Sequence, residues 1–158
     1  MATFTNELIN QCLEVVGGQP HEIRESETSC NIHLFLPGAQ GAQGLTRKIT
    51  IEPKRSLVTI YSQNRNTRAL TEDQKKYSLM FISKANELIS FGNIEMNYDS
   101  GEFRYKTSQA FPGVRDPKPI IGFMLEMHNN IFPKLCEILP KAMSNPDPTE
   151  TAPLLLRL

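Results

Sequence analysis

Cysteine is scarce in this sequence, and the few cysteines form no recognisable pattern. Cys12, Cys30 and Cys136 are odd in number and widely spaced, and no two of them make a CxxC motif. This usage argues against a disulfide framework and favours a reducing compartment. Because no neighbouring base would activate any of them, we expect each cysteine to be a small buried hydrophobic residue and not a nucleophile.

The sequence also lacks an excess of either charge and a long apolar run. Its 17 basic residues balance 17 acidic ones, so the composition supplies no bulk attraction to nucleic acid or anionic lipid. A membrane span needs about 20 mostly apolar residues, whereas the helical stretch 120–139 is interrupted by charged and polar residues. The first residues lack the basic region and apolar core of a signal peptide. We therefore expect a cytoplasmic protein with no membrane segment.

What is present indicates one globular unit followed by a tail. The chain has 158 residues, which is enough to bury a core without disulfides or metals. After Ser144 the sequence is rich in proline and polar residues, which is typical of a segment that does not pack. We predict a single domain over 1–144 and a Pro-rich tail over 145–158. Its apolar end, Leu154 to Leu158, is predicted to dock on the sheet or on the last helix and to cover apolar surface there, and disorder of this end is the alternative.

Hydrophobic periodicity predicts an α+β fold with helices packed on a five-stranded antiparallel sheet. The expected order is a helix over 4–16, strands over 28–36, 45–52 and 56–62, a helix after Thr71, a hairpin over 94–107, and a helix from Asp116. Short links between consecutive strands require antiparallel pairing. In the hairpin, Met96 should lie opposite Phe103 or Tyr105, and Glu95 opposite Arg104 or Lys106.

Two helix features can be predicted in more detail. Thr71 and Gln74 have the spacing of a capping box, and Asp116 with Pro117 is typical of an N-cap followed by proline in the first turn. Pro133 should kink or restart the last helix, because it removes a backbone donor.

No group of residues has the spacing of a catalytic, metal or cofactor site. His21, His33 and His128 are isolated from other ligands, and His128 is expected to be a satisfied core residue. The acids around the hairpin turn match no calcium loop, and the glycines of 38–44 lead into a strand and not into a helix. We therefore predict a protein that is not an enzyme and that needs no cofactor or metal.

Two surfaces are candidates for binding a macromolecule. The first is apolar: three residues of the last helix are offset from its core stripe, and one more apolar residue precedes that helix. The residues are Phe111, Ile120, Phe123 and Met127. The second is basic and lies within 47–76, where an anionic partner could dock. Its candidate residues are Arg47, Lys48, Arg65 and Arg68. An ordinary solvated surface remains the simpler interpretation of this basic region.

Two segments resemble a known family. The helix end Ile82-Ser-Lys-Ala-Asn-Glu-Leu-Ile is followed by Phe91-Gly-Asn-Ile-Glu-Met-Asn-Tyr-Asp-Ser-Gly-Glu-Phe-Arg-Tyr-Lys-Thr-Ser. Together with Met127-His128 and Phe132-Pro133, this resembles the YbjN-like family, bacterial proteins described as sensory transduction regulators, and most of all a cyanobacterial-type member. The resemblance covers most of 26–139. It implies a type III secretion chaperone-like fold and no enzymatic activity.

These observations favour a non-catalytic protein-binding module, regulatory or chaperone-like, that acts as a homodimer. The alternative is a nucleic-acid-associated regulator that uses the basic 47–76 region, although a net charge of zero makes nucleic acid the weaker choice.

Overall fold

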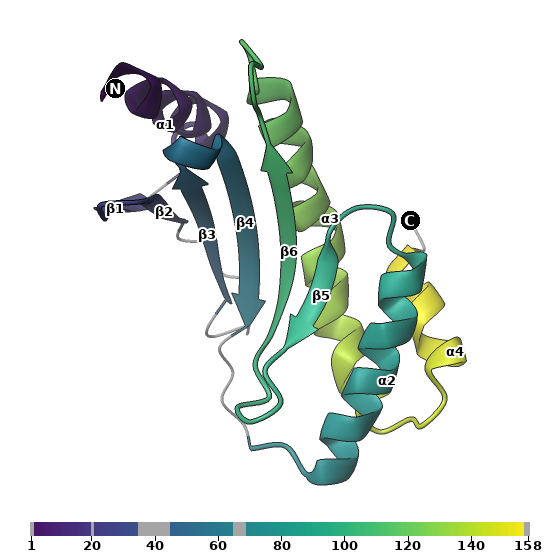
Figure 1. The fold of residues 1–158 in the computed structure, drawn as a ribbon. Coiled ribbons are helices and arrows are strands. Elements are labelled where there is room, and N and C mark those ends of the chain that lie inside the picture. Colours follow the sequence, from purple (N-terminus) through teal and green to yellow (C-terminus); the bar gives the residue numbers. More distant parts are fainter. Residues whose placement is uncertain (1, 20, 35–44, 65–68, 157–158) are drawn as a thin grey trace.

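Figure 1 shows a sheet of antiparallel strands with helices packed along it. The structure, a computed structural model, describes residues 2–19, 21–34, 45–64 and 69–156. Its elements are α1 (Ala2–Val16), β1 (His21–Glu25), β2 (Cys30–Leu34), β3 (Leu45–Glu52), β4 (Leu57–Asn64), α2 (Glu72–Leu88), β5 (Asn93–Met96), β6 (Phe103–Ala110), α3 (Lys118–Ala142) and α4 (Pro148–Thr151). Short 3-10 helices lie at Pro53–Arg55 (η1) and Ala152–Leu156 (η2).

The strands pair in the order β1-β2-β3-β4-β6-β5, and every neighbouring pair is antiparallel. This confirms the α+β class, but the described part of the chain has six strands where five were predicted. The missed strand is β1, which forms a hairpin with β2. All five of its residues are exposed, so it lacks the alternation of buried and exposed positions by which sequence reveals a strand.

Alternate strand residues are buried on one face of the sheet, and the helices pack against that face. Two apolar clusters result. The α1 cluster contains Ile9, Cys12, Val16, Cys30, Ile32, Leu34, Ile49, Ile51, Val58, Ile60, Phe111, Ile121 and Met124. The α2 cluster contains Phe81, Ile82, Ala85, Ile89, Ile94, Phe103, Tyr105, Ile131, Phe132, Leu135, Ile138, Leu139, Ala142, Ala152 and Leu155. The helix α3 therefore joins the two clusters, because its first turns belong to one and its later turns to the other.

The hairpin of β5 and β6 has the predicted register. Met96 lies opposite Phe103, and Glu95 lies opposite Arg104. The Glu95 carboxylate accepts a hydrogen bond from Arg104 at 2.6 Å and another from the Asn93 amide at 3.0 Å. Burial by itself would raise the pKa of Glu95, but these hydrogen bonds outweigh it and lower that pKa. The cross-strand pair thus keeps Glu95 charged and holds the two strands in register.

Replacing Gly101 with valine is expected to lower the free energy of unfolding by about 1–3 kcal/mol. Gly101 ends the hairpin turn at a φ of 73°, and a Cβ there would lie 2.9 Å from Leu70 Cδ1. A β-branched residue resists this backbone conformation. Chemical denaturation measures the loss, and Gly101→Asn should recover part of it, since asparagine tolerates a left-handed backbone. Equal stability of wild type and the valine variant would contradict the prediction.

The first and last turns of α2 are held by side-chain hydrogen bonds. Thr71 Oγ1 accepts from the Gln74 backbone N–H, and the Gln74 amide oxygen accepts from the Thr71 N–H, which confirms the capping box. Near the other end, the Asn86 side chain accepts from Ile94 N–H at 2.8 Å and donates to Ile94 O at 2.9 Å. Asn86 therefore occupies the outer edge of β5 as a further strand would.

The start and the course of α3 differ from the prediction. Pro117, and not Asp116, occupies the N-cap position, while the Asp116 carboxylate accepts from the Lys118 N–H at 3.2 Å. The helix also continues through Pro133 to Ala142, so a restart at Pro133 is not found. Pro133 is exposed while its neighbour Phe132 is buried. Packing on the sheet side holds the helix together where a backbone donor is missing.

The segment predicted as a tail packs onto the protein as far as residue 156. Asp147 accepts from the Thr149 N–H and caps α4, and η2 follows directly. Both short helices contact α2 and α3, and Ala152 and Leu155 are buried in the α2 cluster. The prediction that this segment does not pack is therefore wrong for its described part, and docking on the last helix is confirmed. The segment packs mainly on α2 and α3.

Candidate binding site

The residues predicted to bind a protein partner separate into two groups. Ile120 and Phe123 lie on the outer side of α3, where 39% and 47% of their surfaces are exposed. The Phe123 ring packs against Phe91 with centroids 5.3 Å apart. Met127 is partly buried against the α2 cluster. Phe111 is only 4% exposed and belongs to the α1 cluster, so its assignment to an exposed patch is wrong.

Phe111 is buried because the alternation of β6 continues past the end of the strand. Residues 103, 105 and 107 are buried on the helix side of the sheet, and position 111 has the same parity. The Phe111 N–H donates to Ser56 O at 2.7 Å, which keeps the chain beside β4 at this point. The parity of position 111 could be read from the sequence, and this signal could have predicted that Phe111 is buried.

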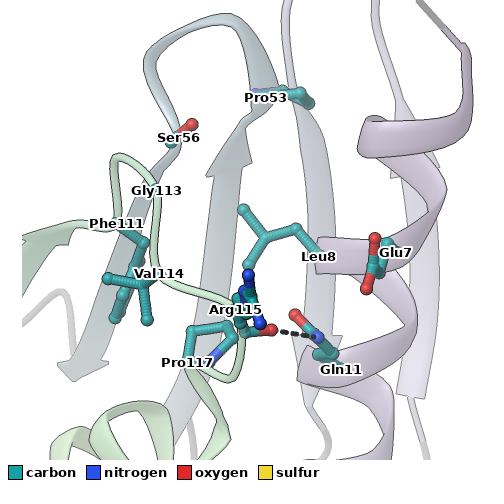
Figure 2. A pocket seen from close by; sticks show the side chains of 10 residues that line it. All are labelled: Glu7, Leu8, Gln11, Pro53, Ser56, Phe111, Gly113, Val114, Arg115 and Pro117. Carbon is teal, nitrogen blue, oxygen red and sulfur yellow. Dashed lines mark hydrogen bonds between the residues drawn. The ribbon is translucent and has the colours of Figure 1, made fainter.

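Phe111 also lines a pocket of about 340 Å³ on the surface. Figure 2 shows this pocket between α1, the turn at Pro53 and the loop 111–117 that leads into α3. Its apolar lining comes from all three segments and consists of Leu8, Pro53, Phe111, Val114 and Pro117. Val114 is 42% exposed, which is high for a valine and leaves one wall open to a ligand.

Polar groups lie at the same pocket and tie its walls together. The Gln11 side chain donates to Arg115 O at 3.4 Å, as the dashed line in Figure 2 shows. Just beyond, Lys118 Nζ donates to Glu14 at 2.9 Å, a second link between α1 and the start of α3. Glu7 and Arg115 add one charge of each sign to the lining. Little in the sequence pointed to this site, because its residues come from distant segments.

Of the residues predicted to form a basic surface, the structure describes Arg47 and Lys48 and places them on opposite faces of the sheet. Arg47 is 4% exposed and lies on the helix side of the sheet, so its place in an exposed patch is wrong. Lys48 points to the opposite face, as consecutive strand residues must, and its Nζ lies 5.1 Å from the centre of the Tyr61 ring. Arg65 and Arg68 lie outside the described residues. The parity of Arg47 with Ile49 and Ile51 was the available signal.

Arg47 belongs to a buried polar network centred on His128. Its Nε donates to Ser62 Oγ at 2.9 Å, and its Nη1 donates to Asn129 Oδ1 at 2.6 Å. The imidazole contacts Ser62 Oγ through Nδ1 at 2.8 Å and Thr107 Oγ1 through Nε2 at 3.0 Å. Both ring nitrogens of His128 are thus occupied, which confirms the prediction of a satisfied core histidine.

Burial determines the chemistry of this network. It lowers the pKa of His128 to about 3, with a further lowering by the Arg47 charge, and it lowers the pKa of Arg47 to about 10. Ser62 and His128 have the contact of a nucleophile and its base, but both are 0% exposed. No substrate reaches either group, and a histidine with so low a pKa is a weak base. The network connects β3, β4, β6 and α3 through side-chain hydrogen bonds.

Burial favours the protonated form of all three cysteines. Cys12 and Cys30 are buried, as predicted, and Cys136 is partly buried. Burial raises the pKa of Cys12 to about 12 and that of Cys136 to about 11. A thiol in this state is a poor nucleophile at neutral pH.

The described residues show neither a metal-binding group nor a membrane-spanning helix. Among the described residues, no three or more His, Cys, Asp or Glu side chains form a group that could hold a metal ion. In the same part of the chain, no helix has the length and apolar character needed to cross a membrane.

No family model, curated protein or solved structure matches the chain.

Proposed function

We propose that the protein is a non-catalytic module that binds another protein, and that the pocket on Phe111 receives an apolar side chain of the partner. The pocket carries this proposal. Its volume of about 340 Å³ is at the small end of ligand sites, which suits one or two side chains better than a nucleotide-sized cofactor. Its walls are largely apolar, and its glutamine, glutamate and arginine suit the polar backbone of a bound segment.

Exposed apolar residues beside the pocket support the same role. The Ile120 N–H donates to Pro117 O, so Ile120 lies within one helical turn of the pocket lining. Phe123 follows one turn further along α3 and is 47% exposed. Large apolar side chains of this kind mark surfaces that associate. We propose that the partner segment extends from the pocket over these first turns of α3.

The cellular role, the location and the oligomeric state belong to the same proposal. The resemblance of 82–108 to the YbjN-like family favours a regulatory or chaperone-like role, in the cytoplasm and as a homodimer. The basic surface offers less support for an anionic partner, because Arg47 is buried and Lys48 faces the other side of the sheet.

A displayed library of random peptides tests whether the pocket binds an apolar segment. Peptides enriched on the wild-type protein should share an apolar anchor residue. Val114→Glu should weaken their binding by about tenfold or more in a fluorescence anisotropy titration, because it places a charge in the apolar wall. Leu79→Glu, at an equally exposed leucine of α2 outside the pocket, is the matched control and should leave affinity unchanged. Failure to enrich peptides, or equal binding by the Val114 variant, would overturn the proposal.

A further inference from the structure

The two edges of the sheet differ in how their outward backbone groups are hydrogen-bonded. The outer edge of β5 is occupied by the Asn86 amide, which bonds to both backbone groups of Ile94. At the other edge, β1 is the outermost strand of the sheet (Figure 1), and all five of its residues are exposed. Among the described residues, no side chain is hydrogen-bonded to the backbone groups on the outer side of β1. An exposed strand edge is a template for pairing with another strand.

The register of the β1–β2 hairpin defines which residues direct their backbone groups outward. The Ser26 N–H donates to Ser29 O across the turn at 2.8 Å, so this pair is hydrogen-bonded. Because hydrogen-bonded and non-bonded pairs alternate in an antiparallel ladder, Arg24 and Glu22 bond to β2. The N–H and C=O groups of Glu25, Ile23 and His21 then point away from the sheet. They are available to a partner strand.

The order of side chains in β1 is complementary to itself. The strand reads His-Glu-Ile-Arg-Glu and is centred on Ile23. If a second copy runs antiparallel with Ile23 opposite Ile23, Glu22 faces Arg24 and Arg24 faces Glu22. His21 faces Glu25 at both ends of the pairing. Ile23, which is 41% exposed in the single chain, then covers its own counterpart.

We propose that β1 is the homodimer interface, pairing antiparallel with β1 of a second copy about a two-fold axis at Ile23. Two six-stranded sheets would thereby become one continuous sheet. The outward backbone groups of Ile23, His21 and Glu25 meet those of the partner strand in this register. The inference concerns the homodimer of the proposed function and does not depend on the pocket.

The same charges select this register. A two-fold axis at Glu22 would place glutamate opposite glutamate, and an axis at Arg24 would place arginine opposite arginine. Charged residues on an edge strand usually prevent pairing, because most registers bring like charges together. Here Glu22 and Arg24 already form an ion pair at 3.1 Å within one strand. In the dimer, four alternating charges would surround the axis, while five residues per strand keep the interface small.

Charge exchange at Glu22 and Arg24 tests the pairing by sedimentation velocity over a range of concentrations. Wild type should pass from monomer to dimer as concentration rises. Glu22→Arg and Arg24→Glu each place like charges in opposition, so each variant alone should remain monomeric. An equimolar mixture of the two variants should dimerise, and so should the double exchange, because opposite charges face each other again. Both side chains are exposed, so thermal melts of all variants should match wild type.

Three results would overturn the inference: a wild type that stays monomeric at the highest concentration, single variants that dimerise as wild type does, or a mixture that shows no heterodimer. Val114→Glu serves as the control for the pocket. It should weaken peptide binding and leave dimerisation intact, so failure of the pocket and failure of the β1 pairing are separate outcomes.

Discussion

Replacing Phe132 with alanine is expected to reduce the free energy of unfolding by about 3–5 kcal/mol. The ring is 1% exposed and lies in the α2 cluster, where its centroid is 6.3 Å from that of Phe103. Removing it leaves a cavity between the sheet, α2 and α3, and well-packed neighbours relax only partly into such a space. Urea denaturation with a two-state fit measures the loss.

Phe123 on the same helix is the matched control. It is 47% exposed and contacts Phe91, so Phe123→Ala should cost no more than about 1 kcal/mol. A loss below about 1 kcal/mol at Phe132, or equal losses at the two positions, would contradict the phase of α3 in the structure.

Acidification should begin to destabilise the protein near pH 6.5, before most carboxylates are protonated. Burial and the Arg47 charge hold the pKa of His128 at about 3, below the ordinary value of 6.5. The folded protein keeps the imidazole neutral, whereas the unfolded chain binds a proton below about pH 6.5. The stabilisation is therefore complete above pH 6.5 and is lost progressively as the pH falls toward 3.

The expected loss from His128 is roughly 2 kcal/mol as the pH falls from about 6.5 to about 4.5. Denaturant titrations at several pH values measure it, and His128→Gln is the comparison because it removes the titrating group. The variant should be less stable at neutral pH and less sensitive to pH in this window. Parallel pH profiles of the two proteins, or an NMR titration that shows His128 protonating near pH 6 in the folded state, would contradict the prediction.

The sequence was sufficient to locate the strands in which buried and exposed residues alternate. In β3 the apolar residues Ile49 and Ile51 alternate with polar ones, and the strand was located correctly. The same was true of the β5–β6 hairpin, because a slip by one residue would turn its aromatic residues to solvent. The strand β1 has no buried residue, so its pairing with β2 depends on backbone bonds that leave no trace in hydropathy. The docked segment at Leu155 was uncertain for a related reason, since proline-rich composition outweighs a few leucines.

The candidate site was harder to predict, because it depends on proximity in space. Leu8 and Val114 meet in the pocket although about a hundred residues separate them in the chain. Two errors could have been avoided. Arg47 has the parity of the buried isoleucines of β3, and Phe111 has the parity of the buried residues of β6. In both cases residue type was given more weight than position, although a strand buries whatever lies on its inner face.

The division of the core into two clusters sets an order in which the protein can fold as it is synthesised. The α1 cluster draws its last member, Met124, from the first turns of α3. The α2 cluster needs Leu155, which is added 31 residues after Met124. During translation the first cluster can close while the second is still open, since domains form from the N-terminal side as the chain emerges. Until Leu155 leaves the ribosome, the parts of α2 and α3 that η2 covers in the finished protein remain exposed.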